Sequence, residues 1–476
     1  MSVQRKPERP VPPLFPARDE RERVDDRLTR ELAAAQERVA AGPVVPKLDL
    51  AAFRSELAAF DFREPRPLEA ALSWCIEKLE HGIVHLTHPR YFGLFNPAPT
   101  FPAQCADRIA GAFNPQLATW TTSPVAVEIE RHVVRSIAHR AGLPAEAVGH
   151  FTSGGSEANC TALLCALTRA HPRFASEGAR VFTGAPVFYT SNESHLAWLK
   201  IAHQVGFGRS AVRLVPTNGA GCLDPGALAG MLAADRKGGS IPVMIVATAG
   251  TTNAGMIDPL EACADLAREA GIWFHVDAAW GGALIVSEAL RATLDGIERA
   301  DSMTLDAHKW FATTMGAGMF ISRHAQALST AFHVSTTFMP SELERVDPYV
   351  TTAQWSRRFV GLRLFLALAV AGWSGYEAHV RRSIDLIAEL RDELASRGWQ
   401  IANRSPLAVL CVTPPEGSGE PRSIVRRVID SGRAWVAVAK LEGRDVIRIC
   451  ITHGQASRDD IRELAKVLYE SRHMEP

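Results

Sequence analysis

Short apolar runs alternate with amphipathic stretches through the middle of the chain, from about residue 150 to residue 321. Apolar runs such as 243–247 and 273–276 predict strands buried on both faces, because a strand with one exposed face would alternate polar and apolar residues. Stretches with apolar residues three and four positions apart, such as 157–170, predict helices. Strands separated by helices indicate an α/β fold with a mostly parallel sheet covered on both faces.

The expected strands of this sheet are His150–Thr152, Val187–Thr190, Ala211–Val215, Val243–Ala247, Trp273–Val276, Ser302–Leu305 and Met319–Ile321. The expected helices between them are Glu157–Ala170, His195–Gln204, Pro225–Ala234 and Leu260–Ala270. Ligands bind such sheets outside the carboxyl ends of the strands, so residues just after these strands are the candidates for chemistry.

The flanking regions have other patterns and divide the chain further. Residues 1–21 are rich in proline and charge, which predicts a flexible tail. Residues 22–115 form a helical N-terminal segment, and residues 116–375 form the large domain. Residues 376–476 form a small α+β domain that begins with a long amphipathic helix, 376–397. Its further expected strands and helices are Leu407–Val412, Trp435–Ala439 and Val446–Ile451, and Ile424–Ile429 and Asp459–Tyr469.

The composition excludes several classes of protein. Lys and Arg together number 52, as do Asp and Glu, so a nucleic acid or an anionic membrane is not the expected partner. The eight cysteines form no CxxC pair, which fits reduced thiols and a cytoplasmic enzyme. The N-terminus lacks an apolar signal segment, and the apolar stretch 364–373 is too short to span a bilayer.

Three features placed after expected strands point to one cofactor. Lys309 follows the strand that ends near Leu305, and Asp277 directly follows another strand. The turn Gly154–Gly155–Ser156 lies between a strand and a helix, where backbone N–H groups bind phosphate. An amine for a Schiff base, a carboxylate for a ring nitrogen and a phosphate site together hold pyridoxal 5′-phosphate (PLP).

Each feature has a simpler explanation when it stands alone. The glycine turn is then an ordinary strand-to-helix connection, Asp277 a turn cap, and Lys309 a surface lysine. The order of the three features, each after a strand-like run, is what makes the PLP interpretation specific. His81, His85 and His88 have a spacing that suggests a metal, but no HExxH motif is present, so we expect structural roles and no metal site.

The chain resembles the group II PLP-dependent amino-acid decarboxylases, which include the aromatic amino-acid and glutamate decarboxylases. The similar region runs from about residue 88 to about residue 359. The similar segments, in the order of the family, are His88–Phe92, Ser123–Pro124, Glu128–Glu130, Ser156–Ala158, Ala247–Thr252, His275–Ala279 and His308–Trp310. The resemblance implies a PLP-dependent transferase fold of type I, similar to aspartate aminotransferase, and a homodimer with shared active sites.

The resemblance also implies a role for individual residues. Lys309 would form the aldimine with PLP, Asp277 would pair with its ring nitrogen, and His195 would stack on its ring. Without the resemblance, His195 would be a histidine at a helix start. His308 is also a candidate proton donor. The other residues expected around PLP are Thr252 and Ala279 near the ring, and Gly154, Gly155, Ser156, Ser302 and His308 at the phosphate.

The chain departs from the family in the catalytic loop. Phe338 stands where the family has a tyrosine that protonates the carbanion left by loss of CO2. Phenylalanine has no hydroxyl group to donate a proton. A carbanion without this donor can react with oxygen, and the products are then an aldehyde, ammonia and hydrogen peroxide. Under a different alignment of the loop, Tyr349 supplies the hydroxyl.

The substrate pocket is expected to be mixed in character. Phe95 and Trp120 are candidates to face an aromatic ring, and Asn96 and Gln116 to bind a polar group, unless some of these side chains point away. In the family, the segment before Ser123 reaches into the neighbouring subunit. No arginine marks a partner for a side-chain carboxylate, which disfavours glutamate.

Four functions are compatible with these residues. The first is decarboxylation of an aromatic or related L-amino acid to an amine and CO2. The second is the oxygen-dependent route to an aldehyde. The third is carbon–carbon lysis of a phosphorylated amino alcohol, although no basic cluster for a second phosphate is evident. The fourth is a non-enzymatic scaffold, which the joint presence of Lys309, Asp277 and His195 disfavours.

Overall fold

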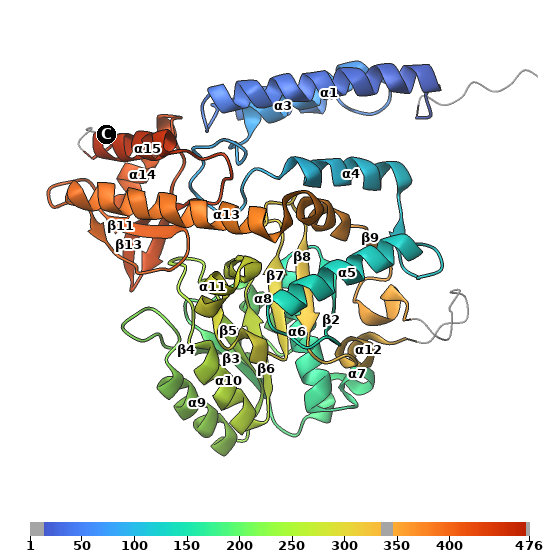
Figure 1. Cartoon of the computed structure of the whole chain (residues 1–476), viewed down its shortest axis with the longest axis vertical. Coiled ribbons are helices and arrows are strands. Elements are labelled where there is room, and N and C mark those ends of the chain that lie inside the picture. Colours follow the sequence, from blue (N-terminus) through green and yellow to red (C-terminus); the bar gives the residue numbers. More distant parts are fainter. Residues whose placement is uncertain (1–13, 335–345, 473–476) are drawn as a thin grey trace, which may run out of the picture.

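A seven-stranded sheet forms the centre of the molecule (Figure 1). The computed structural model describes residues 14–334 and 346–472. The strand order is β2-β8-β7-β6-β5-β3-β4, in which β8 runs antiparallel to β2 and β7 and all other neighbours are parallel. The prediction of a mostly parallel sheet is therefore confirmed. The strands are β2 (Val148–Thr152), β3 (Pro186–Ser191), β4 (Val212–Val215), β5 (Ile241–Thr248), β6 (Trp273–Asp277), β7 (Ser302–Asp306) and β8 (Gly318–Ser322).

Helices cover both faces of this sheet because its strands are apolar on both sides. In β5, Ile245 and Ala247 pack with one group of helices, while Met244 and Val246 pack with the other. The first group is α5 (Pro124–Arg140), α9 (Pro225–Lys237) and α10 (Leu260–Ala270). The second is α6 (Gly155–Ala170), α8 (Ala197–Gln204) and α12 (Ala327–Phe332). Two short helices, α7 (Phe174–Glu177) and α11 (Glu288–Arg291), lie in the connections.

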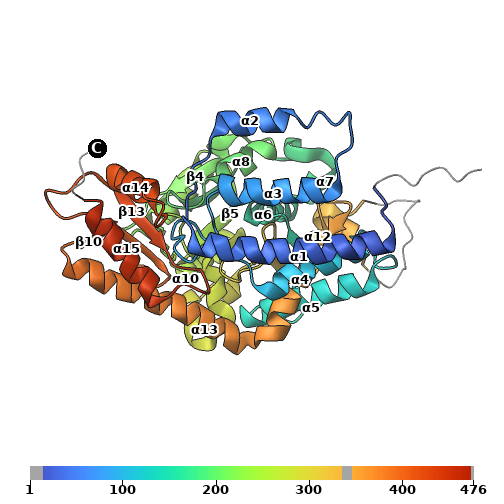
Figure 2. The ribbon, with the colours of Figure 1, turned by 90° about the horizontal axis from the view of Figure 1, so that it is seen from above.

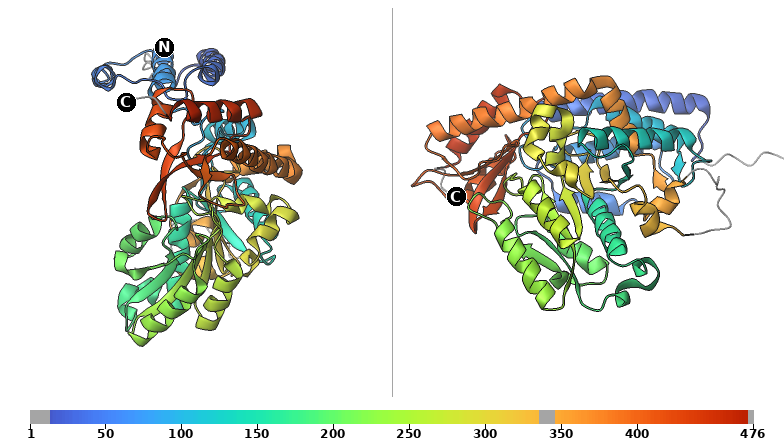
Figure 3. Two further views of the ribbon diagram at one scale, coloured as in Figure 1. Left: turned by 90° about the vertical axis from the view of Figure 1, so that its left-hand side faces the viewer. Right: turned by 60° about the horizontal axis from the view of Figure 1, so that its bottom comes forward.

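The N-terminal helices stand apart from the sheet, above the body in Figure 1 and in the left view of Figure 3. They are α1 (Arg18–Ala41), α2 (Leu50–Ala58) and α3 (Leu68–Gly82). Figure 2 shows α1 and α3 running alongside each other, where Arg27 of α1 pairs with Glu69 of α3. The sequence predicted a first helix from residue 22, and the helix begins four residues earlier.

A long helix joins the large domain to the C-terminal part of the chain. This helix, α13 (Gly361–Ser396), is interrupted at Gly372, whose positive φ of 62° suits a residue without a side chain. The predicted boundary at residue 376 falls within it. Helix α4 (Phe101–Phe113) packs against α13. Among the described residues, no helix is both long enough and apolar enough to cross a bilayer.

The C-terminal part is a four-stranded antiparallel sheet with two helices on it. Its order, β10-β11-β13-β12, includes one short strand, β10, that the sequence pattern did not predict. The predicted α+β architecture of this part is confirmed. The elements are β10 (Gln400–Ile401), β11 (Val409–Thr413), β12 (Ala437–Leu441), β13 (Arg444–Cys450), α14 (Pro421–Asp430) and α15 (Arg458–Glu470).

A buried ion pair fixes the chain where it enters α13. Strand β9 (Arg357–Arg358) pairs with β1 (Gln116–Leu117), and Arg357 turns into the core beneath them. Its guanidinium donates to both carboxylate oxygens of Glu130, at 2.6 and 3.1 Å, and to the carbonyl of Phe151 at 3.1 Å. The side chains of Arg357 and Glu130 are only 4% and 6% exposed, so neither charge has water as an alternative partner.

Replacing Arg357 with leucine should lower the free energy of unfolding by about 3 kcal/mol, because Glu130 would be left buried without its cation. Urea denaturation followed by circular dichroism measures this loss. Arg358→Leu is the matched control, since that arginine is 61% exposed and its pairing with Asp107 should contribute less than about 1 kcal/mol. Equal losses in the two variants would contradict a special role for the buried pair.

Candidate active site

A pocket of about 330 Å³ opens at the carboxyl ends of β5, β6 and β7. Parallel strands direct these ends to the same edge of the sheet, which is where ligands bind in such folds. Residues from three distant parts of the sequence meet here, as the three predicted anchors require. The predicted residues that line the pocket are Phe95, Gly154, Gly155, Ser156, His195, Thr252, Asp277, Ala279, His308 and Lys309.

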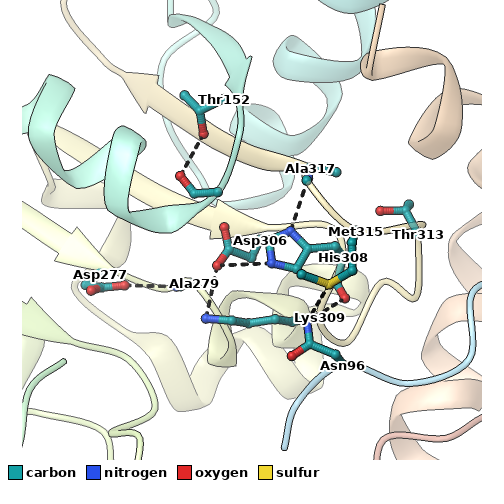
Figure 4. Close-up of polar contacts among 12 residues, drawn as sticks. Asn96, Thr152, Asp277, Ala279, Asp306, His308, Lys309, Thr313, Met315 and Ala317 are labelled. Atoms are coloured by element: carbon teal, nitrogen blue, oxygen red, sulfur yellow. Dashed lines mark hydrogen bonds and ion pairs between the residues drawn. The ribbon is translucent and has the colours of Figure 1, made fainter. Parts of the chain in front are cut away.

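Lys309 enters the pocket from the turn that follows β7. Its Nζ lies 3.0 Å from Oδ2 of Asp306, the last residue of the strand (Figure 4). Lys309 is only 20% exposed, and Asp306 is 3% exposed. The second oxygen of this carboxylate, Oδ1, is buried and has no hydrogen-bond partner within the described part of the chain. The amine of Lys309 therefore lies against the carboxylate of Asp306, which has one oxygen left to accept a hydrogen bond.

Asp277 ends β6 on the same edge. Its Oδ2 accepts a hydrogen bond from Nδ2 of Asn159 on α6, at 2.8 Å, and its Oδ1 accepts one from the backbone N–H of Ala279, at 3.2 Å. The residue is 5% exposed. These two hydrogen bonds fix the orientation of the buried carboxylate.

Two histidines present a ring nitrogen to the pocket. His308 accepts the N–H of Ala317 at its Nδ1, at 3.1 Å, so its Nε2 faces the pocket. Burial lowers the pKa of His308, and the neutral ring then carries its proton on Nε2. His195 lies in the turn before α8, where its Nδ1 accepts the N–H of Ala197 at 3.1 Å.

The start of α6 faces the same space. The N–H groups of Gly155 and Ser156 belong to the first turn, which has no acceptors within the helix, and are suited to an anion. A Cβ atom on Gly155 would lie 2.9 Å from Oδ2 of Asp306, so a side chain would fill this end of the pocket. On the opposite wall, Phe95 stacks on Trp280 with 4.3 Å between ring centroids.

Ser302 is not part of the pocket, and its expected contact with the phosphate is wrong. It is the first residue of β7, whereas the pocket lies beyond the last one, Asp306. Its hydroxyl instead contacts Trp273 and His275 in the core, at 2.8 Å each. The prediction failed because Ser302 begins the strand that precedes Lys309, and the start of that strand lies at the opposite edge of the sheet from the pocket.

Of the four residues predicted to contact the substrate, only Phe95 lines the pocket. Phe95 lines the pocket, and the amide of Asn96 is turned toward the carbonyl of His308, at 3.5 Å, and the sulfur of Met315 (Figure 4). Gln116 donates to Ser356, at 2.7 Å, and Trp120 donates to Glu128, at 2.9 Å. Neither Gln116 nor Trp120 lines the pocket of its own chain.

Two further predicted residues concern the catalytic loop. Phe338 lies outside the described residues. Tyr349 is buried, stacks on Trp355 with 4.9 Å between ring centroids, and does not line the pocket. In the described ranges, no group of three or more His, Cys, Asp or Glu side chains has the geometry of a metal site.

Several pocket residues were not predicted from the sequence. Asp306 and Asn159 had a signal: Asp306 stands three residues before Lys309, and Asn159 lies one turn after Gly155 on the buried face of a helix. Ser153, Glu157, Gly250 and Trp280 lie within two residues of predicted pocket residues in the sequence, and Thr248 is the last residue of β5. The unpredicted residues are Ser153, Glu157, Asn159, Thr248, Gly250, Trp280 and Asp306.

The model of the pyridoxal-dependent decarboxylase conserved domain matches residues 58–411. The chain belongs to this family. Tryptophan decarboxylase 1 of Oryza sativa subsp. japonica is 26% identical over 438 residues, which cover 86% of this chain and 85% of the relative. The L-2,4-diaminobutyrate decarboxylase of Rhizobium meliloti (strain 1021) is 29% identical over 403 residues, with coverages of 83% and 79%. The crystal structure of Rhodiola rosea 4-hydroxyphenylacetaldehyde synthase is 22% identical, covers 96% of this chain and 98% of that chain, and has a TM-score of 0.87.

The decarboxylase is thus a PLP-dependent carboxy-lyase of group II with fold type I, as the resemblance implied. The pocket fits the cofactor of the family. It provides an amine on Lys309, a fixed carboxylate on Asp277, and a glycine at a helix start where a Cβ would take up space. Asp306 is the exception, because its carboxylate lies against the helix start that suits a phosphate.

Replacing Asp306 with asparagine should therefore strengthen PLP binding about tenfold, since one negative charge near the phosphate end of the pocket is removed. Titration of the apoprotein with PLP, followed by the visible absorbance of the bound cofactor, measures this affinity. Pyridoxal, which lacks the phosphate, is the control ligand, and its affinity should change little in the variant. A similar gain for both ligands would mean that Asp306 acts on Lys309 instead.

Proposed function

We propose that the enzyme converts an aromatic or related L-amino acid into the corresponding amine and CO2. The observation that carries the proposal is the convergence of Lys309, Asp277 and His195 in one pocket with an aromatic wall. The similarity to tryptophan decarboxylase 1 supports an aromatic substrate. The similarity to a diaminobutyrate decarboxylase is of the same order, so the side chain of the substrate is to be determined by experiment.

Each group in the pocket has a distinct role in this proposal. Lys309 Nζ would hold the aldehyde of PLP, Asp277 its ring nitrogen, and the N–H groups of Gly155 and Ser156 its phosphate. PLP, when bound, supplies the electron sink that stabilises the carbanion left by loss of CO2. His195 would lie against the cofactor ring, held by the bond from Ala197 N–H to its Nδ1.

His308 is the proton donor that the described part of the pocket offers. Burial keeps its ring neutral, and the N–H of Ala317 occupies Nδ1, so the proton resides on Nε2. That atom lies 3.9 Å from Asp306 Oδ2, and because this carboxylate carries no proton, a proton that the ring gives up is returned by solvent. A donor at this position is compatible with amine formation without a tyrosine in the loop.

The substrate side of the pocket has one aromatic wall, formed by Phe95 and Trp280. Phe95 is 6% exposed and lies between Trp280 and the guanidinium of Arg448, which is 4.5 Å from the ring centroid. Among the described lining residues there is no arginine. An aromatic side chain fits such a wall, whereas an acidic side chain or a second phosphate would lack a partner. This favours decarboxylation over lysis of a phosphorylated amino alcohol.

The aldehyde-forming reaction is a second candidate because of Phe338. That residue replaces the tyrosine expected in the loop, and a phenylalanine cannot protonate a carbanion. The 4-hydroxyphenylacetaldehyde synthase of Rhodiola rosea has the same fold. The two candidates share every step up to loss of CO2 and differ only in whether a proton or oxygen reaches the carbanion.

Product identification in air distinguishes the two candidates. We expect the PLP-loaded enzyme to yield an amine from at least one aromatic L-amino acid, with Lys309→Ala inactive and without the visible band of the bound cofactor. Mass spectrometry scores amine and aldehyde, and a peroxide assay scores oxygen reduction. Aldehyde with matching peroxide would establish the second candidate, and Phe338→Tyr should then raise the amine-to-aldehyde ratio. An unchanged ratio would exclude Phe338 as the cause.

A homodimer is part of the proposal. Helices α2 and α3 contain no buried residue in the described chain, and short helices that bury nothing are not stable in water. Leu79 of α3 and Phe101 and Phe113 of α4 are 58%, 74% and 82% exposed. A hollow of about 660 Å³ lies between α1, α4 and α13. A second copy that covers these surfaces would also bring Gln116 and Trp120 toward a neighbouring pocket.

Light scattering coupled to size exclusion should give about 103 kDa, twice the 51.7 kDa mass of the chain. The double variant Leu79→Asp/Phe113→Asp should shift the population toward 51.7 kDa, because it places two charges on apolar surface that a partner would bury. Leu214→Asp on the edge strand β4 is the control, because Leu214 is also exposed (45%) but lies far from this surface in sequence and fold. A monomeric wild-type protein would contradict the proposal.

A further inference from the structure

A row of polar side chains crosses the buried face of β6 and β7 beneath α6. Side chains alternate along a strand, so Trp273, His275 and Asp277 of β6 share one face. In the register of the two strands, His275 lies beside Ser302, and Asp277 lies beside Thr304. His275, Ser302 and Thr304 have no exposed surface. In the described part of the chain, the side-chain hydrogen bonds of these groups run to one another and to α6.

Asn159 of α6 connects this row to Asp277. Its Nδ2 donates to Asp277 Oδ2 at 2.8 Å. Its Oδ1 accepts the hydroxyl of Thr304 at 2.7 Å and lies 3.1 Å from Nε2 of His275. At the far end of the row, the oxygen of Ser302 lies 2.8 Å from Nδ1 of His275 and accepts Nε1–H of Trp273 at 2.8 Å.

The chemistry of the two ends fixes the direction of every bond. The indole of Trp273 can only donate, so Ser302 accepts there and is free to donate its own proton to His275 Nδ1. At the other end, the carboxylate of Asp277 can only accept, so the amide of Asn159 must turn its NH2 group toward it and its oxygen toward His275. That oxygen accepts the hydroxyl of Thr304 with one lone pair, and its second lone pair faces His275, where Nε2–H is the donor that fits.

The histidine in the middle satisfies both requirements. Burial lowers the pKa of His275 to about 4, so the ring is neutral at physiological pH, with one donor and one acceptor nitrogen. With the proton on Nε2, Nδ1 accepts from Ser302 and Nε2 donates to Asn159. The other tautomer would place the lone pair of Nε2 against the oxygen of Asn159, and it would leave the Ser302 proton without its acceptor.

We propose that Trp273, Ser302, His275 and Asn159 form a one-way hydrogen-bond relay that orients the carboxylate of Asp277 toward the ring nitrogen of PLP and strengthens the hydrogen bond it accepts. The inference rests on the pairing of Asp277 with that nitrogen in the proposed function. Each bond in a chain with one direction polarises the next, so the donors together stabilise the negative charge at its end. Ser302 is then a positioning residue that acts on the cofactor from the opposite edge of the sheet.

The test compares two cofactors that differ only at the ring nitrogen. Apoprotein is titrated with PLP and with 1-deazapyridoxal 5′-phosphate, in which a C–H group replaces that nitrogen. The main variant, Ser302→Ala, removes the hydroxyl of the relay. The matched control is Ser322→Ala, because Ser322 is paired with Ser302 in the sheet, is equally buried, and donates to a backbone carbonyl instead. Circular dichroism confirms that each variant is folded.

We expect Ser302→Ala to weaken PLP binding about threefold and Asn159→Leu, which removes the donor itself, at least about tenfold. The affinity for the deaza analogue should not change in Ser302→Ala and should fall less than the affinity for PLP in Asn159→Leu, whose side chain lines the pocket, and Ser322→Ala should leave both affinities unchanged. Equal losses for the two cofactors would show a merely structural effect and overturn the relay. Unchanged PLP affinity in folded Ser302→Ala would overturn it as well.

Asp277→Asn separates failure of the relay from failure of the proposed function. It should weaken binding of PLP far more than binding of the deaza analogue. If Asp277→Asn discriminates between the two cofactors and Ser302→Ala does not, the relay is wrong and the role of Asp277 stands. If Asp277→Asn affects both cofactors equally, the pairing of Asp277 with the ring nitrogen is wrong, and the relay fails with it.

Discussion

The parallel pairing of β6 with β7 is the contact on which the active site depends. It sets Asp277 beside Thr304 and brings the two strand ends to one edge, so that Asp277 and the turn holding Lys309 border the same pocket. The same register stacks His275 beside Ser302 at the other edge. A shift by one residue would turn these side chains to the opposite face of the sheet, where an apolar core packs.

Two buried aspartates, Asp277 and Asp306, border the same pocket. Asp277 and Asp306 are both nearly buried, and Lys309 is the one lysine or arginine among the described lining residues. Asp277 is stabilised by donors, whereas Asp306 has Lys309 and one unfilled oxygen. The neutral histidines His275 and His308 add bonds without adding charge. The carboxylate of Asp277 is therefore held in place by hydrogen bonds, whereas the carboxylate of Asp306 has an oxygen that can accept a hydrogen bond from a bound ligand.

The N-terminal helices obey a different constraint. Their contacts within the chain include ion pairs between α1 and α3, such as Arg27 with Glu69, and the packing of Phe53 of α2 on Trp74 of α3. Exposed ion pairs contribute little to stability, which supports the proposal that a second copy covers these helices. The large domain, by contrast, buries both faces of its sheet and is complete by itself.

The sequence determined the elements and the identity of the cofactor site. The apolar period predicted all seven strands of the main sheet to within about two residues, because burial on both faces leaves a local signal. The anchors Lys309, Asp277 and Gly155 were found because each follows a strand, and strand ends are recognisable without knowing which strands are neighbours.

The tertiary structure decided which of these local features meet. Ser302 was misplaced and Asn159 and Asp306 were missed, since distance to the pocket depends on strand order and on the edge at which a residue lies. Neither is encoded in a local pattern, because residues more than a hundred positions apart, such as Asn159 and Asp277, become neighbours only when the sheet and its helices pack. The sequence therefore specified the chemical groups, and packing specified their partners.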